Sequence, residues 1–306
     1  MTAAVSTRDG QAGPSRATPR IGLALGAGGA GGLAHILMLE VFDELGVKPC
    51  HIAGTSAGAV IGALYASGIP ATGIREIAAD LAIGDSDSLR TILLEKNVFR
   101  WARLLEPEIG RGGLISTERL LAALYHQIEA TVFEELEIPL SVVATDFWRR
   151  RQVVFDRGPF RRAVEGSMAI PGLFTPVHID DRLLVDGGVV NPVPWDILPR
   201  DCDITVAVDV TGTRSRTERL SSLDAVLNTF DIMQTSIVAA KRASSEPDIY
   251  VKPALVDIRT LEFYRLDDIV TQARPARETF KRDLAAAIES HERCRKALSG
   301  KPSDAG

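Results

Sequence analysis

Residues 54–58 read Gly-Thr-Ser-Ala-Gly, the G-x-S-x-G spacing of a serine nucleophile. The string stands between a short apolar run and an alanine-rich segment, which is the setting of a sharp strand-to-helix turn. Such a turn holds the serine in a strained backbone conformation, so Gly54 and Gly58 must be small to avoid clashes. The following helix start also favours negative charge at Ser56. The alternative is an ordinary glycine turn in which Ser56 caps a helix.

A nucleophilic serine needs a base, and the histidines are poor candidates. His178 is expected in a loop, His291 on a solvated helix face, and His35 packed within a helix. Asp186 is better placed, because it follows an apolar run and precedes the two glycines Gly187 and Gly188. A carboxylate in apolar surroundings has a raised pKa, which makes it a better proton acceptor. The alternative is a turn aspartate at a strand end.

Five glycines stand among the seven residues 26–32. Such a loop at the start of a helix exposes backbone N–H groups that can hold an anion. The string also fits the dinucleotide pattern G-x-G-x-x-G, which requires an acidic residue about twenty positions later. The second expected strand instead runs into residues 54–56, which include no carboxylate. On this string alone, anion binding and a tight turn with close helix packing both stay open.

The surrounding elements indicate an α/β protein with a parallel sheet. Strands are expected at 21–25 and 51–53, and each is followed by a glycine turn and a helix, at 33–45 and 57–67. This order occurs twice in about fifty residues and therefore favours a single α/β domain. Further strands are expected at 140–144, 152–155, 183–185, 204–210 and 249–251, and helices at 117–129, 223–243 and 266–298, the last of which Pro275 could break.

Composition bounds the class of protein. The chain has 306 residues, a net charge of -5, 45% apolar and 25% charged residues, which excludes a collagen, a coiled coil or overall disorder. A negative net charge argues against nucleic-acid binding. Three cysteines are too few for a disulfide framework or a zinc site and favour a reducing compartment. No apolar run approaches the length of about 18 residues that a membrane span needs. We expect a cytoplasmic protein, at most peripheral to the inner face of the membrane.

Taken together, the three motifs resemble the patatin-like phospholipases, in particular their small bacterial members. That family uses a Ser–Asp dyad without histidine. The resemblance spans about residues 21–210 and implies a three-layer fold, with a central, mostly parallel sheet flanked by helices. Residues 1–20 are rich in Ser, Thr, Ala, Pro and Gly and are expected to be a disordered arm. We expect an acyl hydrolase domain at 21–260 and a C-terminal helical extension and tail at 261–306. Secondary matches are residues 33–36, 143–146, 167–176 and 191–192.

The resemblance assigns roles by position. Ser56 corresponds to the nucleophile, Asp186 to the general base, and the backbone N–H groups of Gly28, Gly29 and Ala30 to the oxyanion hole. The family usually has an arginine where this chain has a glycine, and Ala27 replaces the first glycine of the family's loop. The motif glycines are Gly26, Gly31, Gly32, Gly54, Gly58, Gly187 and Gly188, and Gly31 is the one that replaces the arginine.

The resemblance implies a lipid acyl hydrolase of the phospholipase, lysophospholipase or carboxylesterase type, acting through an acyl-enzyme. No metal or cofactor is expected. The expected partner is a lipid or phospholipid ester, with transient contact to a membrane surface and no nucleic acid. An acyltransferase on the same dyad, or a catalytically weak lipid-binding regulator, are the alternatives. The head group, the acyl chain, the position cleaved and the oligomeric state stay open.

Two arginine-rich segments could contact a membrane. Residues 94–105 have apolar side chains at helical spacing among basic ones, which fits either an amphipathic surface helix or lid, or a helix facing the core. A second cluster follows residue 146 and could bind phosphate head groups or form the exposed end of a hairpin. Its members are Arg149, Arg150, Arg151, Arg157, Arg161 and Arg162.

Overall fold

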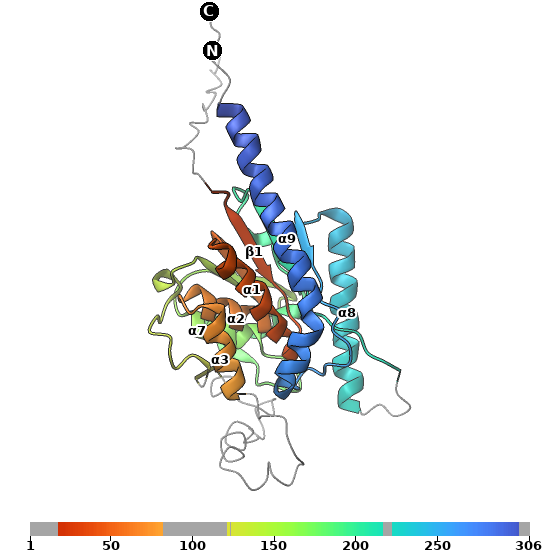
Figure 1. Cartoon of the computed structure of the whole chain (residues 1–306). Helices are drawn as coiled ribbons and strands as arrows, with labels where there is room; N and C mark the ends of the chain where they lie inside the picture. Colours follow the sequence, from red (N-terminus) through yellow and green to blue (C-terminus); the bar gives the residue numbers. More distant parts are fainter. Residues whose placement is uncertain (1–17, 82–120, 123, 217–221, 300–306) are drawn as a thin grey trace, which may run out of the picture.

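A computed structural model of the chain describes residues 18–81, 121–122, 124–216 and 222–299 (Figure 1). The expected amphipathic segment at 94–105 lies outside the described residues. So do residues 1–17 of the expected disordered arm and residues 300–306 of the tail.

The fold is built on one eight-stranded sheet. Its parallel part runs in the order β3 (Leu140–Asp146), β2 (His51–Thr55), β1 (Ile21–Leu25), β7 (Ile204–Val208) and β8 (Ile249–Val251). Every residue of β1 and β3 is buried. A strand that is covered on both faces is expected to carry apolar residues along its whole length, instead of alternating apolar and polar residues. Most residues of β1 and β3 are apolar. The predicted mostly parallel sheet is therefore confirmed.

Three strands join this sheet antiparallel to their neighbours: β4 (Arg151–Phe155), β5 (Val177–Ile179) and β6 (Arg182–Asp186). β4 pairs with residues 142–146 of β3, so it occupies one edge of β3 along that length. A strand has only two edges on which to form ladder hydrogen bonds. Any other strand that pairs with this part of β3 must therefore lie on the opposite edge.

That opposite edge is shared by two strands. β2 pairs with residues 140–143 of β3, and β6 pairs with residues 144–146. β2 runs parallel to β3 and β6 runs antiparallel to it, so the C-terminal ends of β2 and β6 face each other. Their last residues, Thr55 and Asp186, pair with the adjacent residues Val143 and Ala144.

Helices cover both faces of the sheet. Leu23 and Leu25 of β1 belong to the main core cluster, whereas Ala24 between them belongs to a smaller cluster on the other face. α8 (Ser222–Ser244) contributes Val238 to the smaller cluster. The main cluster is formed with α1 (Ala34–Leu45), α2 (Ala57–Ala66), α3 (Ala71–Leu81), α7 (Phe160–Ser167) and α9 (Leu266–Ser299). The predicted three layers are confirmed.

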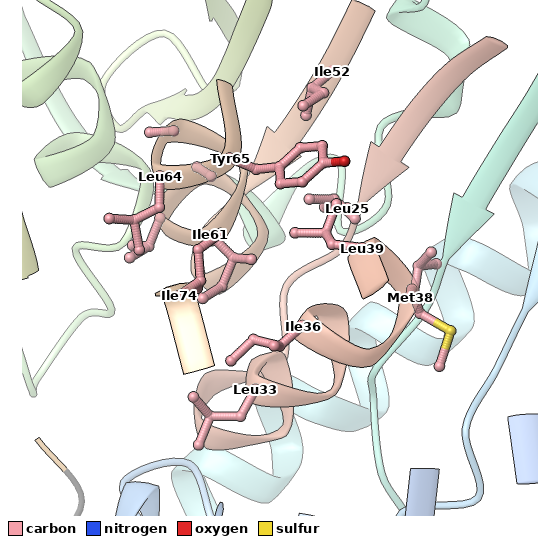
Figure 2. Close-up of a cluster of buried hydrophobic side chains, with 14 of the residues drawn as sticks. Leu25, Leu33, Ile36, Met38, Leu39, Ile52, Ile61, Leu64, Tyr65 and Ile74 are labelled. Carbon is pink, nitrogen blue, oxygen red and sulfur yellow. The ribbon is translucent and has the colours of Figure 1, made fainter. Parts of the chain in front are cut away.

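The helices after the first two strands are joined by one polar link at the margin of the core. Figure 2 shows Leu25, Leu39 and Tyr65 gathered where β1, α1 and α2 pack together. The Tyr65 hydroxyl donates to Asp43 Oδ1 over 2.7 Å, and Asp43 Oδ2 accepts the Ala71 N–H over 2.8 Å. A single carboxylate on α1 therefore anchors α2 and the start of α3.

α9 differs from expectation because Pro275 does not break it. The helix runs unbroken across the front of the sheet in Figure 1. Ile269 and Ala273 before the proline, and Phe280 and Leu284 after it, are all buried in the main core. Burial on both sides of Pro275 stabilises the helix against the loss of one backbone hydrogen bond. The segment after residue 260 thus packs as part of the core.

Other differences concern short or marginal elements. α3, α7 and β5 were not expected, and His178 lies in β5 rather than in a loop. Of the helix expected at 117–129, residues 117–120 and 123 lie outside the described residues. Its described part is helical only to Leu124, because the Ile128 N–H donates to the Tyr125 carbonyl in a tight turn. β7 ends at Val208, two residues earlier than expected.

The packing of α9 predicts a large effect of one substitution. Phe280 is fully buried, and its ring lies 5.9 Å from that of Phe42 on α1. Phe280→Ala should lower the free energy of unfolding by about 3–5 kcal/mol through lost burial and the cavity left behind. Arg282→Ala on the same helix, whose side chain is 73% exposed, should change it by less than about 0.5 kcal/mol. Urea unfolding measures both, and equal stability of the two variants would contradict this packing.

Candidate active site

Ser56 stands at the turn between β2 and α2 in a strained conformation. Its φ is 53° and its ψ is −121°, a region that costs a non-glycine residue about 1–3 kcal/mol. Its N–H donates to Ser167 Oγ over 2.8 Å, and that hydroxyl donates to the Val143 carbonyl over 2.6 Å. The Ser167 hydroxyl therefore ties the strained turn to β3. This is the geometry predicted for a nucleophile elbow.

The elbow glycines are required by close backbone approach. A Cβ on Gly58 would lie 2.1 Å from the Leu25 carbonyl oxygen, and one on Gly54 would lie 2.8 Å from the Ala59 nitrogen. A Cβ on Gly32 of the glycine loop would lie 2.4 Å from the Cβ of Ala57. The first turn of α2 therefore packs directly against the end of β1 and the glycine loop.

The structure brings Ser56 and Asp186 together, as the sequence predicted. Ser56 follows β2 and Asp186 ends β6, so the two residues meet where the ends of these strands face each other. Ser56 Oγ donates to Asp186 Oδ2 over 2.6 Å. Ser56 is 4% exposed and Asp186 1% exposed, so their hydrogen bond is shielded from water. None of the five histidines, all of which are described, hydrogen-bonds to Ser56.

Burial determines the electrostatics of Asp186. Loss of hydration raises the pKa of Asp186 to about 7, although hydrogen bonds from the Ser56 hydroxyl and the Gly188 N–H favour the ionised form. The Gly188 N–H donates to Asp186 Oδ1 over 2.7 Å. The backbone is fixed as well, because the Asp186 N–H donates to the Ala169 carbonyl and the Thr145 hydroxyl donates to the Asp186 carbonyl. The carboxyl group is thus rigidly placed and able to exchange a proton near neutral pH.

The residues after Asp186 cross closely over β3. A Cβ on Gly187 would lie 2.2 Å from the Val143 carbonyl oxygen. A Cβ on Gly188 would lie 2.4 Å from Gln234 Nε2 and 2.9 Å from Asp186 Oδ1. Gln234 of α8 is 3% exposed, and its Oε1 has no hydrogen-bond partner among the described residues. Sequence reasoning missed Gln234, because it is an isolated polar residue in a long helix and no motif marks it.

The glycine loop offers two backbone donors. Among the described residues, the N–H groups of Gly28 and Gly29 donate to no protein acceptor. The third expected donor differs, since the Ala30 N–H donates to the Thr260 carbonyl over 2.9 Å. A Cβ on Gly29, whose φ is 53°, would lie 2.6 Å from the same oxygen. The loop is therefore packed against Thr260 through Ala30, and of the three expected donors only the Gly28 and Gly29 N–H groups lack an acceptor among the described residues.

His35 has a structural part in positioning this loop. Its Nε2 lies 2.8 Å from the Gly26 carbonyl oxygen, and burial lowers the pKa of His35 to about 4. The imidazole is therefore neutral at pH 7, and Nε2 must carry the proton to donate to a carbonyl. The Gly26 N–H in turn donates to the Val208 carbonyl, and the Ala27 N–H to the Pro192 carbonyl. These bonds fix the start of the glycine loop.

Gly31, where the family usually has an arginine, has no room for a side chain here. A Cβ at this position would lie 2.9 Å from the Val210 carbonyl oxygen. Gly28 and Gly31 line a small pocket together with Thr211, Arg214 and Asp231. A cation therefore stands beside the loop, but it comes from the segment after β7. Sequence reasoning missed Arg214, because the pairing of β1 with β7 is what brings it near.

A family model described as patatin-like phospholipase matches residues 23–199. The chain belongs to this family. The matched residues include the glycine loop, the Ser56 turn and Asp186. The resemblance seen in the sequence is thereby confirmed.

Similar proteins include two uncharacterised NTE family proteins of Mycobacterium tuberculosis. One is 38% identical over 199 residues, which is 65% of this chain and 51% of that protein. The other is 33% identical over 194 residues, which is 63% of this chain and 30% of that protein. Lysophospholipase NTE1 of Candida glabrata is 27% identical over 297 residues, covering 87% of this chain and 16% of that protein. The chain spans about half the length, or less, of these curated relatives.

Among solved structures, VipD from Legionella pneumophila has a TM-score of 0.46 and 13% identity, covering 87% of this chain and 68% of that chain.

Among the described residues, none of the helices is long and apolar enough to cross a membrane. The same residues include no group of three or more His, Cys, Asp or Glu side chains that could hold a metal ion.

The strain at Ser56 predicts that glycine is better tolerated there than alanine. Ser56→Gly and Ser56→Ala both remove the hydroxyl, but only glycine relaxes the positive φ. Glycine also makes the unfolded chain more flexible, which offsets part of this gain. Ser56→Gly should therefore be more stable than Ser56→Ala by about 1 kcal/mol. Urea unfolding of the pair at one pH measures the difference. A Ser56→Gly variant no more stable than Ser56→Ala would show that the turn is unstrained.

Proposed function

We propose that this chain hydrolyses carboxylic esters of lipids through a Ser56–Asp186 dyad. The observation that carries the proposal is the buried 2.6 Å hydrogen bond from Ser56 Oγ to Asp186 Oδ2, at a strained strand-to-helix turn. Membership of the patatin-like phospholipase family supports lipid esters as the substrate class. One of the similar proteins is named a lysophospholipase, which is consistent with that class.

Acylation begins with transfer of a proton. Asp186 accepts the Ser56 hydroxyl proton while Ser56 Oγ attacks the ester carbonyl carbon, and the carbonyl oxygen becomes an oxyanion. The Gly28 and Gly29 N–H groups stabilise that oxyanion, which is usually the largest electrostatic contribution in acyl transfer. As the tetrahedral intermediate collapses, the ester C–O bond breaks and protonated Asp186 gives its proton to the leaving alcohol.

Deacylation uses the same groups. Asp186, again ionised, takes a proton from a water molecule as the water oxygen attacks the acyl carbon. The same N–H groups stabilise the second oxyanion. The bond between the acyl carbon and Ser56 Oγ then breaks, and Asp186 returns its proton to Ser56 Oγ. Because Asp186 must be a base and then an acid in each half, a pKa near neutrality suits both roles.

Acyl transfer is the second candidate. It differs only in the last step, where an alcohol such as a lysolipid attacks in place of water. The dyad geometry is the same for both reactions. Incubation with a labelled acyl donor and an added lysolipid separates them, because hydrolysis yields free fatty acid and transfer yields a diacyl product.

The dyad predicts which variants lose activity. Ser56→Ala should lower kcat/KM for a short-chain lysophospholipid at least a thousandfold, on the order of the loss when a catalytic serine is removed. Asp186→Asn should lower it at least about a hundredfold, because the amide cannot accept the proton. A fluorophosphonate probe should label wild-type Ser56 and leave Ser56→Ala unlabelled.

Two matched controls make the same substitutions, Ser→Ala and Asp→Asn, at positions outside the dyad. Ser67→Ala removes a serine at the other end of α2, and Asp180→Asn removes an exposed carboxylate two residues before β6. Both should retain activity. Absence of probe labelling in folded wild-type protein would refute Ser56 as the nucleophile.

The pKa of Asp186 predicts how the rate depends on pH. Only the ionised carboxylate accepts the Ser56 proton, and burial places its pKa near 7. The value of kcat/KM should therefore rise about tenfold per pH unit below 7 and level off above about pH 8. Initial rates with a soluble ester from pH 5 to 9 measure this. A rate that is constant down to pH 5 would contradict Asp186 as a base of raised pKa.

A further inference from the structure

The turn between β3 and β4 exposes two aromatic side chains. Trp148 is 73% exposed and Phe147 is 45% exposed, and their rings pack edge to face with centroids 4.9 Å apart. Large aromatic side chains contribute much apolar surface, and soluble proteins seldom leave them together in water without a partner. We call residues 147–151 the hairpin tip.

The hairpin tip is held in place by bonds that do not depend on the aromatic rings. The Phe147 N–H donates to the Leu183 carbonyl of β6 over 2.9 Å. The Arg149 guanidinium donates to Asp146 over 2.9 Å and to Asp181, in the neighbouring β5–β6 turn, over 2.6 Å. Exposure of Trp148 is therefore a property of an ordered turn that is tied to the adjacent strand.

Arginines surround the aromatic pair. Arg150 and Arg151 are exposed, and within the described residues neither forms an ion pair or a side-chain hydrogen bond. Arg149 is neutralised by its two aspartates. Across residues 146–151 and 180–182, four arginines stand against three aspartates, in a chain whose net charge is -5. Asp146 and Asp181 both pair with Arg149, whereas Asp180 forms no ion pair among the described residues. The surface around Trp148 is thus locally positive on an acidic protein.

The hairpin tip lies beyond the same end of the sheet as the dyad. Asp186 pairs with Ala144 of β3, and the tip begins three residues further along that strand. At about 3.3 Å per residue, Phe147 lies about 10 Å past the level of Asp186. A surface that contacts the tip therefore lies, along the strand direction, about 10 Å from the level of the dyad.

We propose that the hairpin tip docks the chain on an anionic phospholipid surface, with Trp148 and Phe147 entering the interface and Arg150 and Arg151 binding head-group phosphates. Tryptophan suits such an interface, because its body is apolar and its N–H is polar. Arginine binds phosphate with several donors and extends an apolar stem. Docking would deliver lipid to Ser56, and this role rests on the proposed function. The docking itself does not depend on that function.

The test measures binding without turnover. The full chain carrying Ser56→Ala is mixed with vesicles of phosphatidylcholine alone or with 30 mol% (about one lipid in three) phosphatidylglycerol, and the bound fraction is measured by sedimentation. We expect tighter binding to the anionic vesicles. In that background, Trp148→Ala should weaken binding to both vesicles about tenfold. Arg150→Gln with Arg151→Gln should weaken binding to the anionic vesicles about thirtyfold and to the neutral ones little.

Matched controls carry the same changes elsewhere. Tyr264→Ala removes an aromatic side chain that is 49% exposed, and Arg282→Gln removes an arginine that is 73% exposed, both distant in sequence from the tip. Both should bind vesicles like the parent. Fluorescence adds a direct readout, because vesicles with brominated acyl chains should quench the parent chain more strongly than its Trp148→Phe variant.

The outcomes separate this proposal from the proposed function. If the parent binds neither vesicle, or if the tip variants bind like the controls, docking through the hairpin tip is wrong, whatever the chain hydrolyses. If binding depends on the tip but wild-type protein hydrolyses no lipid ester, docking stands and the hydrolase proposal fails. With both correct, the tip variants should hydrolyse vesicle lipids more slowly than the wild type, relative to their rates on a soluble monomeric ester.

Discussion

The site depends on one constraint, which is that β2 and β6 share a single edge of β3. Because β4 fills the other edge, the two strands can pair with β3 only end to end. Their opposite directions then place both C-terminal ends at the same point. Ser56 follows one end and Asp186 forms the other, so strand pairing alone brings together two residues that are 130 positions apart. Gly187 follows from this, because the chain after Asp186 must pass within van der Waals distance of the Val143 carbonyl of β3.

The same burial that suits Asp186 to its proposed role opposes folding at neutral pH. Its pKa is raised from 3.8 to about 7, so the folded chain holds the Asp186 proton more tightly than the unfolded chain does. By linkage, the contribution of this group to stability is greatest below about pH 4 and declines as the pH rises to about 7. Above pH 7 the fold carries a buried carboxylate, whose direct hydrogen-bond donors among the described residues are the Ser56 hydroxyl and the Gly188 N–H. Together with the positive φ of Ser56, this concentrates two destabilising features at the dyad, both of which the surrounding core must offset.

Local sequence was sufficient wherever short-range chemistry decides the structure. Apolar runs ending in glycine placed β1, β2 and their helices, and the motifs placed Ser56 and Asp186. Local sequence was insufficient where contacts with a distant segment determine the structure. The positions of Gln234 and Arg214 beside the site depend on how α8 and the segment after β7 pack, which no local pattern encodes. Pro275 suggested a break in α9, but burial of Phe280 and its neighbours overrides that local preference. The family resemblance assigned Ala30 as an oxyanion donor, but its N–H donates to the carbonyl of Thr260, which lies 230 residues later.

That contact with Thr260 extends the packing of the glycine loop beyond the family match, which ends at residue 199. The Thr260 carbonyl accepts the Ala30 N–H and lies where any side chain on residue 29 would have to go. The segment that carries Thr260 continues through a short 3₁₀ turn into α9, and α9 packs on α1, the helix that follows the glycine loop. The loop is thus held from both sides, by His35 of α1 through Gly26 and by Thr260 through Ala30. Since an oxyanion hole is effective only if its donors are fixed before the charge forms, under the proposed function the C-terminal helix supports catalysis as well as the core.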